Sequence, residues 1–363
     1  MALLALLVAG CGSSSEGDPK LDVYVSAPLT GPRADDGRDV ADGAQLALED
    51  AGGEAGGVEV SLEVLDDATR EGWDAAATGA NARTATEDTA AIAYIGELDS
   101  GASRTSIPIT NQAGMLQVSP GAGAEDLTRE SLGSDDVPDV QGTGERTFAR
   151  VIPSDRAQGE AGAAWMSSEG VGSVVVSSDE SDYAAALVSG LEAASDGPEI
   201  VSGDAAAGAV YIAAADAFDS PPAAGFGERG IYGSDAQLDG GARLVSGSTP
   251  VRLTSAAMDP TQLPAEAAGF LSAFEEAYER KPGRYAAYGY EAMAATLDAI
   301  DRADDQTDRS DVVDAFMAIS NRESILGTYS IDGVGNTTLD TQGAYEIGRR
   351  GDPEPLPEAI TVP

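Results

Sequence analysis

Carboxylates are the most abundant side chains in this sequence that could do chemistry, and histidine is absent. The 363 residues contain 62 Asp and Glu, 21 Lys and Arg and one cysteine, Cys11, which gives a formal net charge of −41. Without His, the chain has no Ser–His or Cys–His nucleophilic pair and no imidazole metal ligand. A single Cys permits neither an intramolecular disulfide nor a thiolate zinc site. The negative charge disfavours anionic surfaces, so we expect no nucleic-acid partner.

Leu98, Asp99 and Ser100 form the candidate site that the residues alone indicate. They follow the apolar segment 90–96, which we expect to be a buried strand, and they precede an expected helix. In open parallel sheets, ligands bind beyond the carboxyl ends of the strands. A Ser hydroxyl beside free helix N–H groups can receive a carboxylate. Ser100 could also simply cap the helix, and the two roles are compatible.

The elements that position this site alternate between strands and helices. The strands expected in the first part of the chain have continuous or alternating apolar residues and cover 20–25, 58–65, 90–96 and 115–118. The helices expected between them cover 40–51, 73–85 and 103–114. Pro108 should kink or shorten the last of these helices. This βαβαβα order predicts a parallel sheet with helices on both faces.

The same pattern restarts near Arg150 and predicts a second α/β lobe. Its expected strands cover 173–176, 210–212 and 230–232, and the later helices cover 158–169, 183–194, 270–278, 288–302 and 312–319. Residues 329–331, followed by Asp332-Gly333, are typical of a β-hairpin. The gap between Ile200 and Val210 is too short for an ordinary parallel crossover, so we expect one face of this sheet to be partly uncovered.

The N-terminal residues predict an exported lipoprotein. Ala2–Val8 is an apolar run typical of a secretory signal and is shorter than the roughly 20 residues of a transmembrane helix. Small residues precede Cys11 as in a lipobox, which predicts lipidation of Cys11, and residues 12–19 have the composition of a flexible tether. Because no Lys or Arg precedes the apolar run, we expect the true start codon to lie upstream. The alternative is an ordinary buried or free Cys11 in an irregular terminus.

Four segments in order carry a resemblance to a known family. They are Ala27–Gly31 with Gly43–Ala47, Ile95–Ala102, Gln117–Thr128 and Tyr288–Ala292. Together they resemble the periplasmic leucine/isoleucine/valine-binding proteins, the substrate-binding components of ABC importers. The resemblance covers roughly residues 20–350 and is strong as far as Ile152. It implies the α/β fold of type I periplasmic binding proteins, with two lobes, each a mostly parallel sheet with flanking helices, and three hinge crossings.

The resemblance also implies domain boundaries. Residues 1–19 would be signal peptide, lipobox and tether. The first α/β lobe would comprise residues 20–151 and 256–326, and the second would comprise residues 152–255 and 327–363. The crossings would lie near Arg150, Arg252 and Gly327.

The ligand contacts follow from the same resemblance. It implies that an α-carboxylate binds near Ser100 and the loop Gly121-Ala122-Gly123. Asp235 stands where the family has the acid that binds the α-ammonium, and Tyr183 matches an aromatic residue that closes over the ligand. A solvated Asp235, and a Tyr183 that only packs at the start of its helix, are the alternatives.

Three departures from the family pattern bear on the identity of the ligand. Gly123 replaces a hydroxyl residue, Asp36 replaces an aromatic residue and Asp99 replaces a small one. Loss of the aromatic residue weakens the case for a branched aliphatic side chain. Asp36 and Asp99 would favour a cationic or polar, amine-bearing ligand.

No motif points to catalysis, a cofactor or a metal. A carboxylate-pair hydrolase is chemically conceivable, but nothing singles out such a pair, so we expect no enzyme. The sequence has no Asp-x-Asp-x-Asp-Gly calcium loop and no Walker loop, so energy would come from a partner ATPase. We therefore expect a monomeric lipoprotein on the outer face of the cell membrane. It would close its lobes on an amino acid or related polar amine and deliver it to an ABC permease. The alternative is a surface sensor or interaction lipoprotein on the same scaffold.

Overall fold

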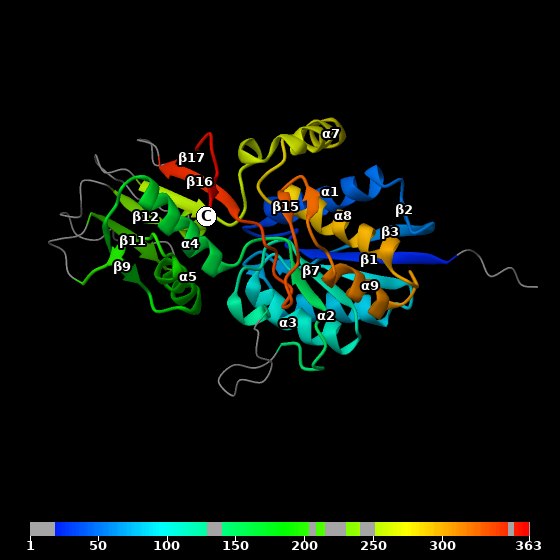
Figure 1. The fold of residues 1–363 in the computed structure, drawn as a ribbon. Helices are drawn as coiled ribbons and strands as arrows, with labels where there is room; N and C mark the ends of the chain where they lie inside the picture. The colour runs from blue at the N-terminus through cyan, green and yellow to red at the C-terminus, as the bar shows by residue number, and fades with distance from the viewer. Residues whose placement is uncertain are drawn as a thin grey trace, which may run out of the picture.

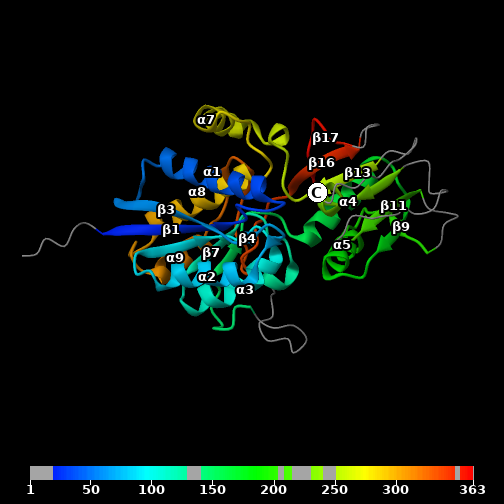
Figure 2. The ribbon, with the colours of Figure 1, turned by 180° about the vertical axis from the view of Figure 1, so that it is seen from behind.

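Two α/β lobes lie side by side in the computed structural model, which describes residues 19–128, 140–202, 208–214, 230–239, 251–347 and 352–362 (Figures 1 and 2). Cys11 and the expected signal segment lie outside the described residues, so they stay predictions. Within the described part of the chain, no helix combines the length and the apolar character needed to span a membrane.

A six-stranded sheet forms the centre of the first lobe. Its strand order is β2-β3-β1-β6-β7-β8, and its strands pair in parallel except for β2, which is antiparallel to β3. The strands are β1 (Lys20–Ala27), β2 (Glu54–Ala55), β3 (Val58–Asp66), β6 (Ala91–Ile95), β7 (Leu116–Ser119) and β8 (Phe148–Arg150). A small hairpin, β4 (Ala68–Thr69) and β5 (Gly72–Trp73), follows β3. β6 is buried at every residue because helices cover both faces of the sheet.

The first lobe's helices pack on opposite faces of its sheet. α1 (Ala34–Asp50) and α8 (Ala286–Arg302) lie together on one face, and α2 (Ala75–Glu87) and α3 (Ser100–Gln112) lie on the other (Figure 1). The remaining helices are α7 (Ala268–Tyr278), α9 (Arg309–Met317) and the 3-10 turns η1 (Glu125–Thr128), η2 (Pro260–Gln262) and η3 (Ala265–Ala267). Pro108 does not shorten α3, because Ile107 and Thr110 beside it are fully buried and their packing outweighs the lost hydrogen bond.

A second sheet, with order β10-β9-β11-β12-β13-β16-β17, forms the other lobe. Its strands are β9 (Ser173–Ser178), β10 (Glu199–Ile200), β11 (Ala209–Ala213), β12 (Ile231–Gly233), β13 (Val251–Ser255), β16 (Thr341–Ile347), β17 (Pro353–Pro355) and β18 (Ile360–Thr361), which pairs with β16. The helices are α4 (Asp155–Ser168), α5 (Asp182–Ala193) and α6 (Asp235–Asp239). The edge strand β10 is exposed at both residues. The expectation that one face of this sheet is partly uncovered depends on the connection after Ile200, of which residues 203–207 lie outside the described residues, so it stays a prediction.

The third crossing lies later in the chain than the predicted position near Gly327. Residues 322–329 form the hairpin of β14 (Arg322–Ser324) and β15 (Gly327–Tyr329), and the second sheet resumes only at Thr341. Tyr329, Ile331 and Leu339 belong to the hydrophobic core of the first lobe. The predicted boundary at residue 327 is therefore wrong, and residues 327–340 belong with the first lobe. The expected hairpin at residues 329–331 is reduced to a single bridge between Ile331 and Thr337.

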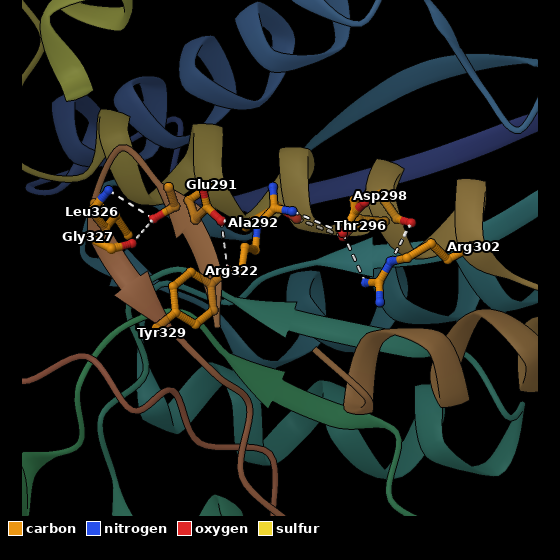
Figure 3. Close-up of polar contacts among 10 residues, drawn as sticks. Glu291, Ala292, Thr296, Asp298, Arg302, Arg322, Leu326, Gly327 and Tyr329 are labelled. Carbon is orange, nitrogen blue, oxygen red and sulfur yellow. Dashed lines mark hydrogen bonds and ion pairs between the residues drawn. The ribbon is translucent and has the colours of Figure 1, made fainter. Parts of the chain in front are cut away.

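A buried carboxylate on α8 explains why this hairpin stays with the first lobe. Glu291 Oε1 accepts hydrogen bonds from Arg322 Nε at 2.6 Å and from the Tyr329 hydroxyl at 2.7 Å (Figure 3). Arg322 also contacts Asp298 Oδ2 at 3.0 Å, about two turns further along the same helix. Because Glu291 is almost fully buried, both strands of the hairpin are tied to α8 by charge-assisted bonds.

Candidate functional site

A cavity of about 640 Å³ lies between the two lobes. Most of the predicted ligand-binding residues line it: Leu98, Asp99, Ser100, Gly121, Gly123, Tyr183 and Asp235. Ala122 is fully buried within the loop behind the cavity wall. Asp36 does not line the cavity but is ion-paired with Arg33, which does. The topology thus brings together residues from the ends of β6 and β7 in one lobe and from α5 and α6 in the other.

The start of α3 presents backbone N–H groups that carry no side-chain cap. Asp99 occupies the N-cap position, and its carboxylate makes no capping hydrogen bond. Ser100 is the first helical residue, so the alternative that Ser100 caps this helix is wrong. The Ser100 Oγ instead accepts a hydrogen bond from the Ala124 N–H at 3.2 Å, which joins the helix to the neighbouring loop. Uncapped first-turn N–H groups at the edge of a cavity are suited to an anionic group.

The loop after β7 is shaped by two buried polar side chains. Ser119 Oγ accepts from the N–H groups of Gly121 and Ala122 at 3.2 and 2.8 Å, and donates to the Glu97 carbonyl at 2.7 Å. Arg150, which has no exposed surface, donates to the carbonyls of Ala122 and Ala124 at 3.1 and 2.9 Å. Sequence reasoning assigned Arg150 only to a crossing and missed this role. An Arg at the end of a buried strand was the available signal.

Asp235 and Tyr183 form a hydrogen-bonded pair on the second lobe. The Tyr183 hydroxyl donates to Asp235 Oδ1 at 2.7 Å, and the Ala256 N–H donates to Asp235 Oδ2 at 3.3 Å. Burial and the charge of Asp235 raise the pKa of Tyr183 well above its usual range, so this hydroxyl stays protonated and acts as a donor. The pair leaves an oriented carboxylate on the cavity wall opposite α3.

Asp36 and Asp99 both form ion pairs with Arg33. Arg33 Nε lies 3.0 Å from Asp36 Oδ2, and Arg33 Nη1 lies 2.8 Å from Asp99 Oδ1. The guanidinium also lies over the ring of Tyr285, 5.2 Å from its centroid. The expectation that Asp36 and Asp99 directly favour a cationic ligand is therefore weakened, because both face a cation already present in the protein.

Asp155 is one of the cavity residues that the sequence analysis did not single out. It is the first residue of α4, follows the Ser154 N-cap and lines the cavity from the second lobe. Its backbone N–H donates to the Gly123 carbonyl at 2.9 Å, which joins the two lobes. Burial and the nearby charge of Asp235 raise the pKa of Asp155 to about 7. An acid directly after a serine at a predicted crossing was the only sequence signal.

The cavity has more acidic than basic groups. Its acids are Asp99, Glu125, Asp126, Asp155, Asp182 and Asp235, and its bases are Arg33 and Arg104. Arg104 is committed to a bidentate pair with Asp126, at 2.6 and 2.7 Å. Among the described residues, no group of His, Cys, Asp and Glu is arranged to hold a metal ion. The cavity can therefore offer carboxylates and backbone N–H groups to a small polar molecule.

Two α/β lobes with a polar cavity between them define a two-lobed ligand-binding protein. The family model described as periplasmic binding protein matches residues 23–217, which is more than half of the chain. The chain therefore belongs to the periplasmic binding protein family, whose members work outside the cytoplasm as ligand-binding components of transporters. No curated protein matches the chain.

Solved structures confirm the predicted fold and the resemblance to leucine/isoleucine/valine-binding proteins. The leucine binding protein LivK of Thermotoga maritima is 23% identical, with a TM-score of 0.68 over 94% of this chain and 99% of that chain. An ABC transporter substrate-binding protein of Desulfitobacterium hafniense, solved in complex with Leu, is 21% identical, with a TM-score of 0.71 over 93% and 100%. A solute binding protein of R. palustris, solved in complex with benzoate, is 19% identical, with a TM-score of 0.66 over 95% and 97%.

Proposed function

We propose that this protein captures an amino acid or a similar small amine-bearing ligand between its lobes and delivers it to an ABC permease and its ATPase. One observation carries the proposal. The uncapped start of α3 with Ser100, and the carboxylate of Asp235 held by Tyr183, line the same cavity from opposite lobes. The two ends of an amino acid are an anion and a cation, so this arrangement matches both. Membrane attachment through lipidated Cys11, and a monomeric state, are parts of the same proposal.

The carboxylate of the ligand would bind on the first lobe. The first-turn N–H groups of α3 and the Ser100 hydroxyl are the donors available there. The positive end of the helix dipole adds to the attraction of an anion. Leucine and benzoate, the ligands in the Desulfitobacterium and R. palustris structures, share a carboxylate, which supports a ligand with an anionic group.

The ammonium of the ligand would bind on the second lobe, where Asp235 already accepts two hydrogen bonds from neutral donors. A ligand that contacts both lobes stabilises the closed arrangement, because only that arrangement satisfies both ends. The closed protein would then dock on the permease.

Binding can be tested by thermal shift and isothermal titration with leucine, valine, arginine, propionamide and benzoate. We expect at least one amine-bearing member to raise the Tm, since a ligand that binds only the folded state stabilises it. Ser100→Ala and Asp235→Asn should each weaken that ligand's binding by about tenfold or more. Glu276→Gln, an exposed position on α7, is the matched control and should bind like wild type.

The same variants can contradict the proposal. Wild-type affinity in both Ser100→Ala and Asp235→Asn would rule out this site, and binding of benzoate alone would rule out an amine ligand. Deletion of the gene should abolish high-affinity uptake of the identified ligand. Unchanged uptake would favour a sensor built on the same scaffold.

A further inference from the structure

Asp155 lies at the contact between the lobes, where its carboxylate borders the cavity. It begins α4 directly after the first crossing, and its side chain is half-buried. Its N–H bond to the Gly123 carbonyl holds it against the loop after β7. The backbone of Asp155 is therefore held at the boundary between the ligand space and the hinge, and its carboxylate borders the cavity.

Gly123 makes room for this carboxylate. A Cβ built on Gly123 would lie 2.1 Å from Asp155 Oδ1, well inside contact distance. Gly123 is not among the described residues with positive φ, so its backbone does not require glycine. The lack of a side chain at Gly123 is thus explained by the space that the Asp155 carboxylate occupies.

The Asp155 carboxylate makes no hydrogen bond or ion pair with any residue that the structure describes. The two cations that line the cavity pair with other acids: Arg104 with Asp126, and Arg33 with Asp36 and Asp99. Arg150, buried behind the loop after β7, donates to the carbonyls of Ala122 and Ala124. A half-buried carboxylate without a counterion is costly in its ionised form. The raised pKa of Asp155, caused by burial and then by Asp235, reflects that cost. A cation supplied by the ligand would remove it.

We infer that Asp155 and Asp235 together form a receptor for a positively charged group, and that the cleft selects small amines of net positive charge, such as basic amino acids or diamines, over neutral amino acids. The inference rests on the proposed function and narrows its ligand class. Both carboxylates belong to the second lobe, as the first residues of α4 and α6, so a cation that contacts both is held by that lobe. The contact of Asp155 with Gly123 then links cation binding to closure against the first lobe.

Isothermal titration at pH 8 with L-lysine, L-arginine, putrescine and L-leucine tests this selection. At least one of the three cations should bind wild type tenfold or more tightly than leucine. Asp155→Asn preserves shape and removes the charge, so it should weaken binding of that cation by tenfold or more. It should weaken leucine binding less than binding of that cation, because leucine carries a single ammonium, which Asp235 can still bind. The Tm of the unliganded variant should be unchanged or higher, because an uncompensated carboxylate has been removed.

Failure of the cation selection can be distinguished from failure of the proposed function. Leucine binding more tightly than all three cations would overturn the inference and leave the proposed function standing. Absence of binding by all of these ligands and by those of the earlier panel would overturn both. Equal cation affinity in wild type and Asp155→Asn would overturn the role of Asp155.

A second variant tests the placement without changing any charge. Gly123→Ala must displace the Asp155 carboxylate, so it should weaken cation binding by tenfold or more in the wild-type background. In an Asp155→Ala background the added methyl meets no carboxylate, and Gly123→Ala should have a much smaller effect on affinity, since the closest remaining contact is the Asp155 backbone nitrogen at 3.3 Å. Gly269→Ala, where a Cβ would meet nothing within 4 Å, is the matched control. Cation affinity like wild type in the single Gly123→Ala variant would overturn the placement.

Discussion

Arg33 Nη1 lies 2.8 Å from Asp99 Oδ1, and through this bond the loop after β1 is tied to the start of α3. The same guanidinium binds Asp36, and all three side chains are only about a quarter exposed. Arg33→Met would leave two half-buried carboxylates without their cation. We expect it to lower the free energy of unfolding by about 2 kcal/mol, measured by urea denaturation.

An exposed pair in the same region provides the control for this prediction. Arg38 pairs with Asp35, whose side chain is 91% exposed. Arg38→Met should change the free energy of unfolding by less than about 0.5 kcal/mol, because solvent screens such pairs. Equal changes in the free energy of unfolding would show that the Arg33 ion pairs stabilise the fold no more than an exposed pair does.

Arg150 supports a second stability prediction, which also concerns the ligand loop. Its guanidinium donates to Ala122, Ala124, Thr128 and Asn336, at distances of 2.8 to 3.1 Å. Arg150→Met removes the donor to the carbonyls of the buried residues Ala122 and Ala124 and should cost about 3 kcal/mol or more in urea denaturation. Ligand affinity should fall as well, because the loop after β7 loses its support. Arg302→Met removes a pair that is about 40% exposed and should cost less than about 0.5 kcal/mol. A small effect of Arg150→Met would mean that water replaces the guanidinium.

The order of elements in the first lobe could be predicted because each strand is a continuous or alternating apolar segment. Boundaries were harder to predict. α1 begins at Ala34, ahead of the predicted start at Val40, because its first turn carries Asp35 and Asp36, which have no apolar period. The third crossing was missed because the tie between Tyr329 and Glu291 joins residues 38 positions apart.

In the candidate site, too, local sequence patterns could be interpreted, whereas contacts between distant residues could not. Ser100 could be placed beside the cavity because it follows a recognisable strand end. The partner of Asp99 could not be found, since Arg33 lies 66 positions away and is one of many basic residues. Asp155 could not be distinguished among 62 acids, because only its contact with Gly123 in the folded chain sets it apart.

A buried pair of carboxyl groups beneath the site predicts how stability depends on pH. Asp67 and Glu97 have no exposed surface, and the Tyr94 hydroxyl donates to Glu97 Oε1 at 2.6 Å. Burial raises the pKa of Asp67 to about 6, and burial with the adjacent Asp67 raises the pKa of Glu97 well above its usual range. The other groups that face Asp67 are Asp66, Asp99 and Arg33, and Ser26 faces Glu97.

Proton linkage determines whether the free energy of unfolding rises or falls with pH. Between about pH 4 and pH 6 the folded protein holds more protons than the unfolded chain, so the free energy of unfolding falls as pH rises. For Glu97 the decline continues above this window. We therefore expect wild type to be less stable at pH 8 than at pH 5 in urea denaturation. Glu97→Gln should flatten this dependence, whereas the exposed control Glu276→Gln should keep it. Identical slopes in wild type and Glu97→Gln would contradict the prediction.

The close packing of α1 against α8 sets the last prediction. A Cβ on Gly289 would lie 2.3 Å from the Val40 carbonyl oxygen, so the two helix backbones approach as closely as glycine permits. Gly289→Ala should push α8 away from α1 and lower the free energy of unfolding by about 2 to 3 kcal/mol. Gly269, on α7, has nothing within 4 Å of its Cβ position, so Gly269→Ala should instead stabilise by about 0.5 kcal/mol through helix propensity. Urea denaturation of both variants measures the contrast. Effects of the same sign would show that helix propensity, and not the approach of the backbones, governs Gly289.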